Sequence, residues 1–308
     1  MFLNKEFVEL CKISLFKWSQ EDLNDFKCYS LDVAKYYYEN FEFIDVLRIF
    51  DSIDDNDNGY LTINMCNKDK YDKVFDVMYY FYEDIKKKYF ETFIKKYEDD
   101  INANNPNEII EKYVKVFKPL VLNNKYKKIV RRGDTFYRAR LGNSEIIETV
   151  DGNSIKVVCP YSDDNIKNPP SSLAKEGRFN RDGFSYYYLS STIDGAISEV
   201  RPKVGNYCSV AEFNVNEDLV LFEFGDLLDL FYYFMKPVCD EVKSHYKFTQ
   251  FFSDVMCKCG VDGIQYYGVQ TGFICLVCFY PKKIDYINKS EILCEIQGVK
   301  YNYYLKTK

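Results

Sequence analysis

Arginine, glutamate and tyrosine side chains in compact motifs are the main candidates for chemistry in this chain. The single histidine, His245, nearly excludes histidine-dependent triads unless it is itself the base. The sequence contains no Gly-x-Ser-x-Gly, phosphate-loop or Gly-x-Gly-x-x-Gly motif. What remains is a set of Arg, Glu and Tyr side chains in compact motifs, in which a guanidinium group is suited to binding phosphate.

The first motif is Phe136-Tyr137-Arg138-Ala139-Arg140. On a strand, side chains alternate between the two faces, so Arg138 and Arg140 share one face. The pair either faces a ligand or is solvated on a half-exposed strand, and the motif alone favours neither.

The second motif is Gly177-Arg178-Phe179-Asn180, followed by Asp182-Gly183. Gly177 permits close approach of the backbone to a ligand. Arg178 offers a planar fork that suits phosphate. The alternative is a hairpin turn at Asp182-Gly183 with an incidental arginine, which is equally compatible with the residues.

The third motif predicts a helix near residues 193–200. Ser191 and Asp194 have capping-box spacing, so the helix should start there, and Pro202 should end it. Ala196 and Glu199 are three residues apart and share a face. A glutamate on the small-residue face of a short helix can point inward, but it can equally be exposed and paired with a nearby basic side chain.

The fourth motif is Tyr246-Lys247-Phe248-Thr249-Gln250, on a predicted helix over 246–259. It leads to a predicted strand containing Ile264 and Tyr266. Taken alone, this region is most simply interpreted as a helix, a turn and a buried strand.

The elements around these motifs differ between the two parts of the chain. The first 125 residues have apolar residues at helical spacing. The predicted helices there are 31–40, 43–50, 71–97 and 108–117, the last capped by Asn107. Beyond Gly133, strands are predicted at 186–189, 208–214, 219–224, 273–280 and 301–305. Residues 151–176 are rich in Asp, Asn, Ser and Pro and are predicted to form a long ordered loop. We therefore predict an α+β chain, with a mainly helical part followed by a mixed α/β domain.

Two features of the sequence resemble metal-binding motifs, but neither predicts a metal site. Residues 54–65 resemble an EF-hand loop, but Met65 replaces the bidentate glutamate, so a turn at Asn58-Gly59 is the preferred interpretation. The 11 cysteines follow no regular framework, which favours reduced thiols. Cys257, Cys259, Cys275 and Cys278 are interpreted as small buried hydrophobes rather than zinc ligands.

The formal net charge of −6 over 308 residues argues against nucleic acid or an anionic membrane as partners. The sequence shows no signal-peptide pattern and no apolar run of about 18 residues, the length that spans a bilayer. These observations predict a cytoplasmic protein.

Together, in this order and spacing, the motifs resemble the RES family of NAD-degrading toxins, which is named after an Arg, a Glu and a Ser. The resemblance covers about residues 134–280. The matching residues are Tyr137-Arg138-Ala139, Gly177-Arg178-Phe179-Asn180, Tyr188-Leu189, Ala196 with Glu199, Thr249-Gln250, and Asp262-Gly263-Ile264 with Tyr266.

The resemblance implies a fold related to ADP-ribosyltransferases over residues 126–308, after a helical domain over 1–125. It also implies NAD⁺ as substrate, inorganic phosphate as a co-substrate option, and no resident cofactor. Arg138 and Glu199 match the catalytic Arg and Glu of the family. The expected NAD-binding residues are Arg138, Gly177, Arg178, Asn180, Tyr188, Gln250 and Tyr266. The family Ser falls on Gly268, so either Thr271 replaces it in space or activity is weakened or lost.

The expected function is phosphorolysis or hydrolysis of NAD⁺ by a toxin or defence effector. The alternatives are transfer of ADP-ribose to a protein and nucleotide binding without catalysis. A ribonuclease of the HEPN type needs an Arg-x₄₋₆-His pair, and His245 lies far outside the helical part. The family implies a neutralising antitoxin as partner, whereas residues 1–125 either regulate the active domain or drive self-association.

Overall fold

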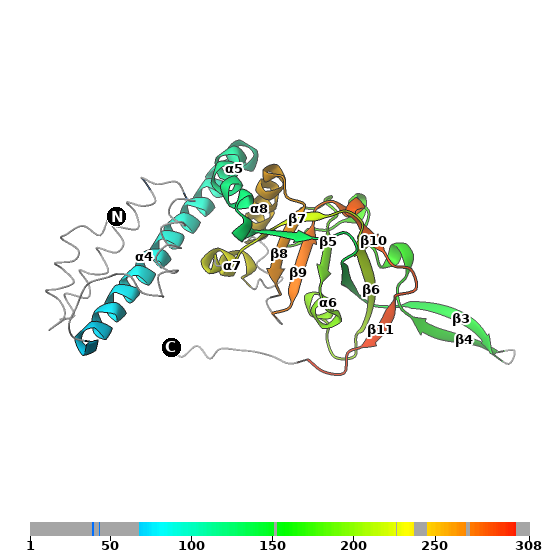
Figure 1. The fold of residues 1–308 in the computed structure, drawn as a ribbon. Helices are drawn as coiled ribbons and strands as arrows, with labels where there is room; N and C mark the ends of the chain where they lie inside the picture. Colours follow the sequence, from blue (N-terminus) through cyan, green and yellow to red (C-terminus); the bar gives the residue numbers. More distant parts are fainter. Residues whose placement is uncertain are drawn as a thin grey trace. The chain divides into compact units, whose positions relative to one another are not determined.

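The computed structural model in Figure 1 describes residues 39, 43, 68–150, 153–225, 227–236, 245–268 and 272–299. The chain divides into two compact units, Met1–Asn105 and Pro106–Lys308. The predicted helices over 31–40 and 43–50 lie outside the described residues, except for the helical residues Glu39 and Phe43. The EF-hand-like stretch, the predicted strand over 301–305 and Thr271 lie wholly outside them.

In the first unit, helix α4 spans Lys68–Ala103 and contains the predicted helix over 71–97. Tyr89, Phe93 and Tyr97 are buried along one side of α4. The ring of Phe43 packs on Phe93 with centroids 4.6 Å apart. The described part of α4 therefore has the aromatic stripe that its helical spacing predicts.

Helix α5, Pro106–Leu122, begins the second unit. The predicted cap at Asn107 is wrong, because Pro106 is the first helical residue. The fixed φ of proline and its missing N–H suit that position. Phe117 packs edge-on against Phe252, with ring centroids 5.1 Å apart. α5 thus covers helix α8, Tyr246–Cys259, whose bounds are those predicted.

The described residues of this unit form a mixed sheet in the order β1-β7-β8-β9-β5-β2-β6-β10, with β11 also paired to β6. Of these pairs, β7 and β8 are parallel and the others antiparallel. The strands are β1 Lys127–Val130, β2 Thr135–Leu141, β5 Tyr187–Ser190, β6 Tyr207–Val215, β7 Leu219–Glu223, β8 Gly263–Tyr267, β9 Ile274–Cys278, β10 Ile284–Tyr286 and β11 Ile292–Glu295. A helical part followed by a sheet-rich domain is the α+β class that the sequence predicts.

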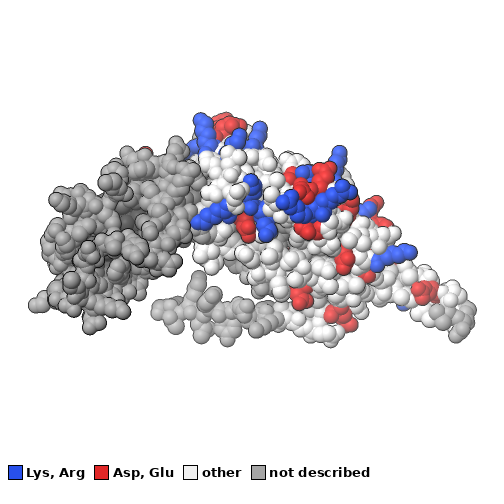
Figure 2. All heavy atoms as spheres, in the orientation of Figure 1, with Lys and Arg blue, Asp and Glu red and all other residues white. Residues whose placement is uncertain are grey.

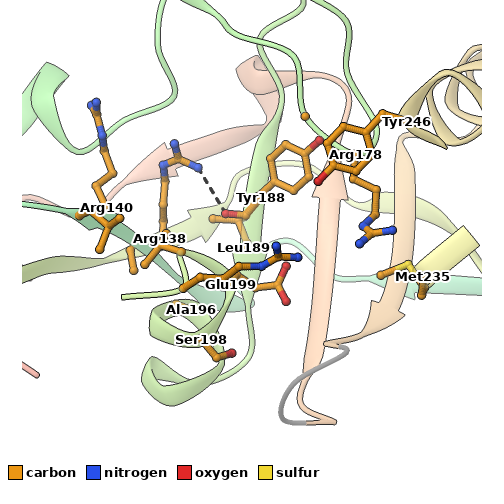
Figure 3. A pocket seen from close by; sticks show the side chains of 15 residues that line it. Arg138, Arg140, Arg178, Tyr188, Leu189, Ala196, Ser198, Glu199, Met235 and Tyr246 are labelled. Carbon is orange, nitrogen blue, oxygen red and sulfur yellow. Dashed lines mark hydrogen bonds between the residues drawn. The ribbon is translucent and has the colours of Figure 1, made fainter. Parts of the chain in front are cut away.

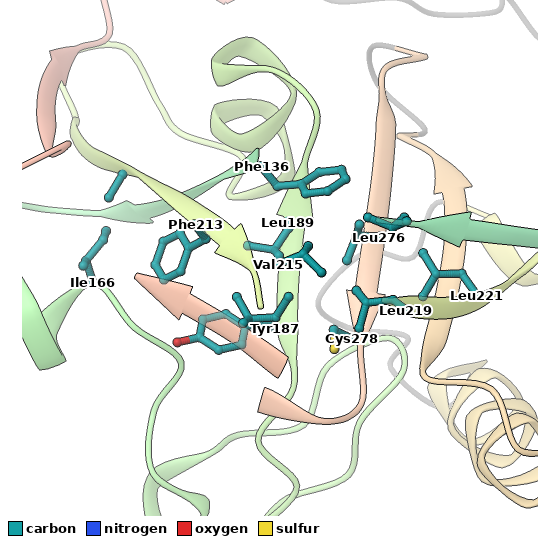
Figure 4. Packing of buried hydrophobic residues seen from close by; sticks show 13 residues of the cluster. Phe136, Ile166, Tyr187, Leu189, Phe213, Val215, Leu219, Leu221, Leu276 and Cys278 are labelled. Carbon is teal, nitrogen blue, oxygen red and sulfur yellow. The ribbon is translucent and has the colours of Figure 1, made fainter. Parts of the chain in front are cut away.

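Buried apolar side chains from most of these strands form one cluster, drawn in Figure 4. Its members include Val130, Phe136, Tyr187, Leu189, Phe213, Leu221, Leu276 and Ile284. A second cluster, Ala139, Ala196 and Val210, packs helix α6 on strands β2 and β6. Strand β2 therefore contributes to both clusters and is fixed firmly in the sheet.

Helix α6, Ile193–Glu199, follows β5 closely, as predicted. Its cap is Thr192 rather than Ser191, because the Thr192 side chain accepts a 3.0 Å hydrogen bond from the Gly195 N–H. Helix α7, Leu228–Met235, was not expected from the sequence. α6 and α7 both supply residues to the cavity described below.

The predicted loop over 151–176 is wrong in its first part, because β3 and β4 form a hairpin over Ser144–Val150 and Asn153–Cys159. In Figure 1 this hairpin projects from the sheet. The rest of the segment is irregular apart from short 3₁₀ turns. These turns are η3 Asp163–Asn165 and η4 Ser171–Leu173, and the second unit has two more 3₁₀ turns elsewhere, η2 Asn124–Tyr126 and η6 Pro281–Lys283. Within the described ranges, no helix has the length and apolar character needed to cross a membrane.

Candidate active site

A cavity of about 600 Å³ opens where strands β2 and β5 separate. The two strands pair at Tyr137 and Ser190, and residues 138–141 and 188–189 then line the cavity. This volume falls within the usual range for small-ligand sites. The charged side chains of the lining are Arg138, Arg140, Arg178, Glu199 and Arg201. Apolar and aromatic lining comes from Ala139, Leu141, Tyr188, Leu189, Ala196, Val200, Met235 and Tyr246, most of which are labelled in Figure 3.

Strand β2 supplies two of the arginines. Arg138 Nε donates a 3.1 Å hydrogen bond to the Ile166 carbonyl, and Arg140 Nη1 donates to the neighbouring Asn165 carbonyl. Two consecutive backbone carbonyls thus hold two neighbouring guanidinium groups. Burial, assisted by Arg140, lowers the pKa of Arg138 to about 10, which still leaves it charged at neutral pH. The strand therefore presents two fixed positive charges.

The loop after Gly177 supplies the third arginine. Arg178 Nη1 donates to the carbonyls of Phe234 and Lys236 at the end of α7, at 2.8 and 3.0 Å. Its guanidinium carbon lies 5.7 Å from the centre of the Tyr246 ring. Burial lowers the pKa of Arg178, while Tyr246 opposes that shift. Among the described residues, Arg178 Nε and Nη2 have no protein acceptor and are available to a ligand.

Two side chains of α8 hold the backbone of this loop. Gln250 Nε2 donates to the Gly177 carbonyl at 3.0 Å and to the Asn180 carbonyl at 3.1 Å. The Thr249 hydroxyl donates to the Arg178 carbonyl. Both side chains are buried, so these bonds form away from competing water. Thr249 and Gln250 therefore fix the position from which Arg178 projects.

The Tyr188 hydroxyl holds the same loop from the side of β5. It donates to Asn180 Oδ1 at 2.8 Å and accepts from the Phe179 N–H at 3.0 Å. A Cβ on Gly177 would lie 2.6 Å from Asn180 Oδ1 and 3.1 Å from the Tyr188 hydroxyl, so only glycine fits. Burial raises the pKa of Tyr188, which keeps the hydroxyl protonated as a donor.

Glu199 is the carboxylate of the cavity, at the last residue of α6. The Tyr266 hydroxyl donates to Glu199 Oε2 at 3.2 Å. Burial raises the pKa of Glu199, and the Tyr266 hydrogen bond, Arg178 and Arg201 each act to lower it. Glu199 is therefore accessible to solvent at the cavity wall, and the hydrogen bond from the Tyr266 hydroxyl orients its carboxylate.

The structure brings five of the predicted site residues to the cavity wall: Arg138, Gly177, Arg178, Tyr188 and Glu199. Asn180, Gln250 and Tyr266 do not line it and instead contact residues that do. Arg201 was not among the predicted site residues. Its position two residues after Glu199 could have indicated that it lies near the same cavity. Arg201 has φ +49 at the end of α6 and lines the cavity.

Gly268, the residue that the resemblance aligns with the serine of the RES family, is buried. Gly268 follows β8 directly, and its N–H donates to the Phe273 carbonyl at 2.8 Å. The nearby thiol of Cys275 is fully buried, and burial raises its pKa to about 12, so it is protonated at neutral pH. In the described part of the chain, no group of three or more His, Cys, Asp or Glu residues could hold a metal ion.

Comparisons with known proteins found one family model that matches part of this chain. Residues 159–295 match the family model of the RES domain. This segment contains Arg178, Glu199 and Gly268, whereas Arg138 precedes it. Among solved structures, the chain is similar to the M. tuberculosis MbcT-MbcA toxin-antitoxin complex, with 10% identity and a TM-score of 0.37. That similarity covers 58% of this chain and 92% of the other. No curated protein matches the chain.

Proposed function

Because residues 159–295 of this chain form a RES domain, we propose that it cleaves NAD⁺ between nicotinamide and ribose. At the level of the family, the match supports a toxin-like enzyme that processes NAD⁺. The observation that carries the finer proposal is the shared cavity of Glu199 and four guanidinium groups. An anionic substrate with a reacting centre that becomes positively charged fits this combination.

Glu199 acts on the sugar. When nicotinamide leaves, the bond from the ribose anomeric carbon to the ring nitrogen breaks, and its electron pair leaves with nicotinamide. The sugar passes through an oxocarbenium-like transition state, as in glycoside cleavage. A nearby carboxylate stabilises that charge and can accept a hydrogen bond from a ribose hydroxyl. The Tyr266 hydroxyl keeps the Glu199 carboxylate oriented for this role.

Arg138 and Arg178 hold the pyrophosphate in the proposed complex. Both line the cavity. Arg138 projects from strand β2, and Arg178 projects from the loop that Gln250 of α8 holds by hydrogen bonds. Guanidinium forks bind phosphate oxygens through paired, charge-assisted hydrogen bonds. The Tyr188 ring supplies an aromatic wall between them, with its hydroxyl engaged by the loop.

Proton NMR of NAD⁺ with the purified protein tests this proposal and identifies the acceptor. The expected result is release of free nicotinamide, with ADP-ribose as the second product if water attacks. Attack by inorganic phosphate would instead yield ADP-ribose 1″-phosphate, and only when phosphate is present. An intact NAD⁺ spectrum after prolonged incubation, both with and without inorganic phosphate in the buffer, would reject the proposed activity.

Gly268 favours a second candidate function, namely nucleotide binding without cleavage. The glycine brings no hydroxyl to the position of the family serine. In that case NAD⁺ would raise the melting temperature of the protein while no nicotinamide appeared.

If cleavage does occur, we propose that a partner protein covering the cavity restrains it, as an antitoxin would.

A further inference from the structure

The cavity carries more positive charge than the pyrophosphate of NAD⁺ requires. Four arginines and one glutamate line it, which gives a formal sum of +3. The two phosphates of a pyrophosphate diester carry about two negative charges, so one arginine remains to be explained. Arg140 is that residue, because Arg138 and Arg178 are assigned to the pyrophosphate and Arg201 acts electrostatically on Glu199.

Arg140 is fixed in place rather than solvated at random. Its Nη1 donates to the Asn165 carbonyl, and its guanidinium carbon lies 5.6 Å from the centre of the Tyr161 ring. Arg138 is held on the adjacent carbonyl of Ile166. Ordering a long side chain costs conformational entropy, so two anchored neighbours form a pre-organised pair.

This pair has no carboxylate partner among the described residues. The charged or polar neighbours that shift the pKa of Arg138 are Arg140, Tyr187 and Tyr188. The two like charges repel each other, and Arg140 contributes to the lowered pKa of Arg138. A doubly charged anion bound between them would relieve that repulsion.

The order of the side chains matches the order of groups in a dinucleotide. In Figure 3, Arg138 lies between Glu199 and Arg140. In NAD⁺ the reacting ribose is followed by the pyrophosphate and then by the adenosine ribose. With the reacting ribose at Glu199 and the pyrophosphate between Arg138 and Arg178, Arg140 lies beyond Arg138, toward the adenosine ribose.

We propose that Arg140, beside Arg138, forms a subsite for a phosphate monoester dianion, so that the cavity accepts dinucleotides phosphorylated on the adenosine 2′-hydroxyl. Arginine is a general solution for recognising that 2′-phosphate. Free inorganic phosphate offers similar chemistry. An acceptor phosphate, however, would have to reach the anomeric carbon beside Glu199, on the other side of Arg138. The proposal rests on the proposed function for the placement of the dinucleotide.

Binding of three adenosine nucleotides to the full chain tests the subsite without catalysis. Adenosine 2′,5′-bisphosphate is expected to bind about 10- to 100-fold more tightly than 5′-AMP, as one extra charge-assisted contact would give. Adenosine 3′,5′-bisphosphate has the same charge and should gain much less. Equal affinity for the two bisphosphates, or competition by millimolar inorganic phosphate against both equally, would overturn the assignment to the 2′-phosphate.

Turnover gives the second readout. The ratio of kcat/KM for NADP⁺ to that for NAD⁺ should fall about 10- to 100-fold in Arg140→Gln, and Arg140→Lys should restore part of it. Lys128→Gln removes one positive charge from an exposed site outside the cavity and should leave the ratio unchanged. An unchanged ratio in Arg140→Gln would overturn the proposal.

The two hypotheses fail separately. If neither dinucleotide is cleaved but the 2′,5′-bisphosphate still binds preferentially through Arg140, the proposed function fails and the subsite stands. If NAD⁺ is cleaved and the nucleotides are not distinguished, the subsite fails and the proposed function stands.

Discussion

The two sides of the cavity fix their arginines in different ways. On the side of β2, regular strand pairing sets the direction of Arg138 and Arg140, and backbone carbonyls hold their guanidinium groups. On the other side, Arg178 projects from an irregular loop. That loop depends on buried hydrogen bonds from the side chains of Thr249, Gln250 and Tyr188. A strand can position an arginine through local periodicity, whereas a loop needs partners that are distant in the sequence.

The comparison predicts that the loop side is the more fragile. Replacing Gln250 with Leu removes the donor to the half-buried Gly177 carbonyl and one of the two donors to the Asn180 carbonyl, which should cost about 1–3 kcal/mol of stability. Displacement of Arg178 should also lower kcat/KM for NAD⁺ about 100-fold. Chemical denaturation and nicotinamide release measure the two effects.

Gln297→Leu is the matched control for that variant, because Gln297 is exposed and outside the cavity. It should change stability by less than about 0.5 kcal/mol. If Gln250→Leu behaves like Gln297→Leu, the loop is held by something other than this amide.

Gly177→Ala should produce the next largest effect. The added Cβ would meet Asn180 Oδ1 at 2.6 Å, so the loop must shift away from Tyr188. We expect a stability loss of about 1–3 kcal/mol, as for other overpacked sites, together with an increased KM for NAD⁺. Gly298→Ala, where an added Cβ meets nothing within 4 Å, should be nearly neutral. Wild-type stability and KM in Gly177→Ala would show that the loop is looser than described.

Tyr266→Phe changes the titration of Glu199. The Tyr266 hydrogen bond lowers the pKa of Glu199 against the burial that raises it, so removing the hydroxyl should raise that pKa. Because the proposed reaction needs the carboxylate ionised, the acidic limb of the kcat/KM profile should move to higher pH, with activity at high pH less affected. An acidic limb that stays in place would show that Tyr266 does not act through Glu199.

The smallest expected effect is the change in stability of Glu199→Gln, which is separate from its effect on activity. Burial raises the folded pKa of Glu199 above its unfolded value, so ionisation of Glu199 costs stability as pH rises through this interval. The neutral variant avoids that cost at neutral pH. Its melting temperature should therefore exceed that of the wild type at pH 7, with the difference shrinking below about pH 4. A difference that grows toward acid pH would contradict this sign.

The sequence predicted the elements with strong local signals. Helix α8 has long helical periodicity and ends at Gly260, whose φ of +90 suits glycine. Local spacing also placed Glu199 and Ala196 on one face of α6. Both line the cavity.

Other features depend on contacts between distant residues and could not be predicted from local patterns. The family resemblance implied that Gln250 and Tyr266 bind the substrate. In the structure they contact the backbone of Gly177 and the carboxylate of Glu199, 73 and 67 residues away. The β3–β4 hairpin was missed because Asp, Asn, Ser and Pro residues dominate the composition of the sequence over 151–176.

The most direct test of the central claim is the rate of nicotinamide release from NAD⁺ by wild type, Glu199→Gln and Asp194→Asn. Asp194 lies on the same helix, is exposed and does not line the cavity, so it controls for the loss of one negative charge. Loss of one transition-state interaction should slow Glu199→Gln about 100- to 1,000-fold, with Asp194→Asn close to wild type. Wild-type release by folded Glu199→Gln would contradict the account.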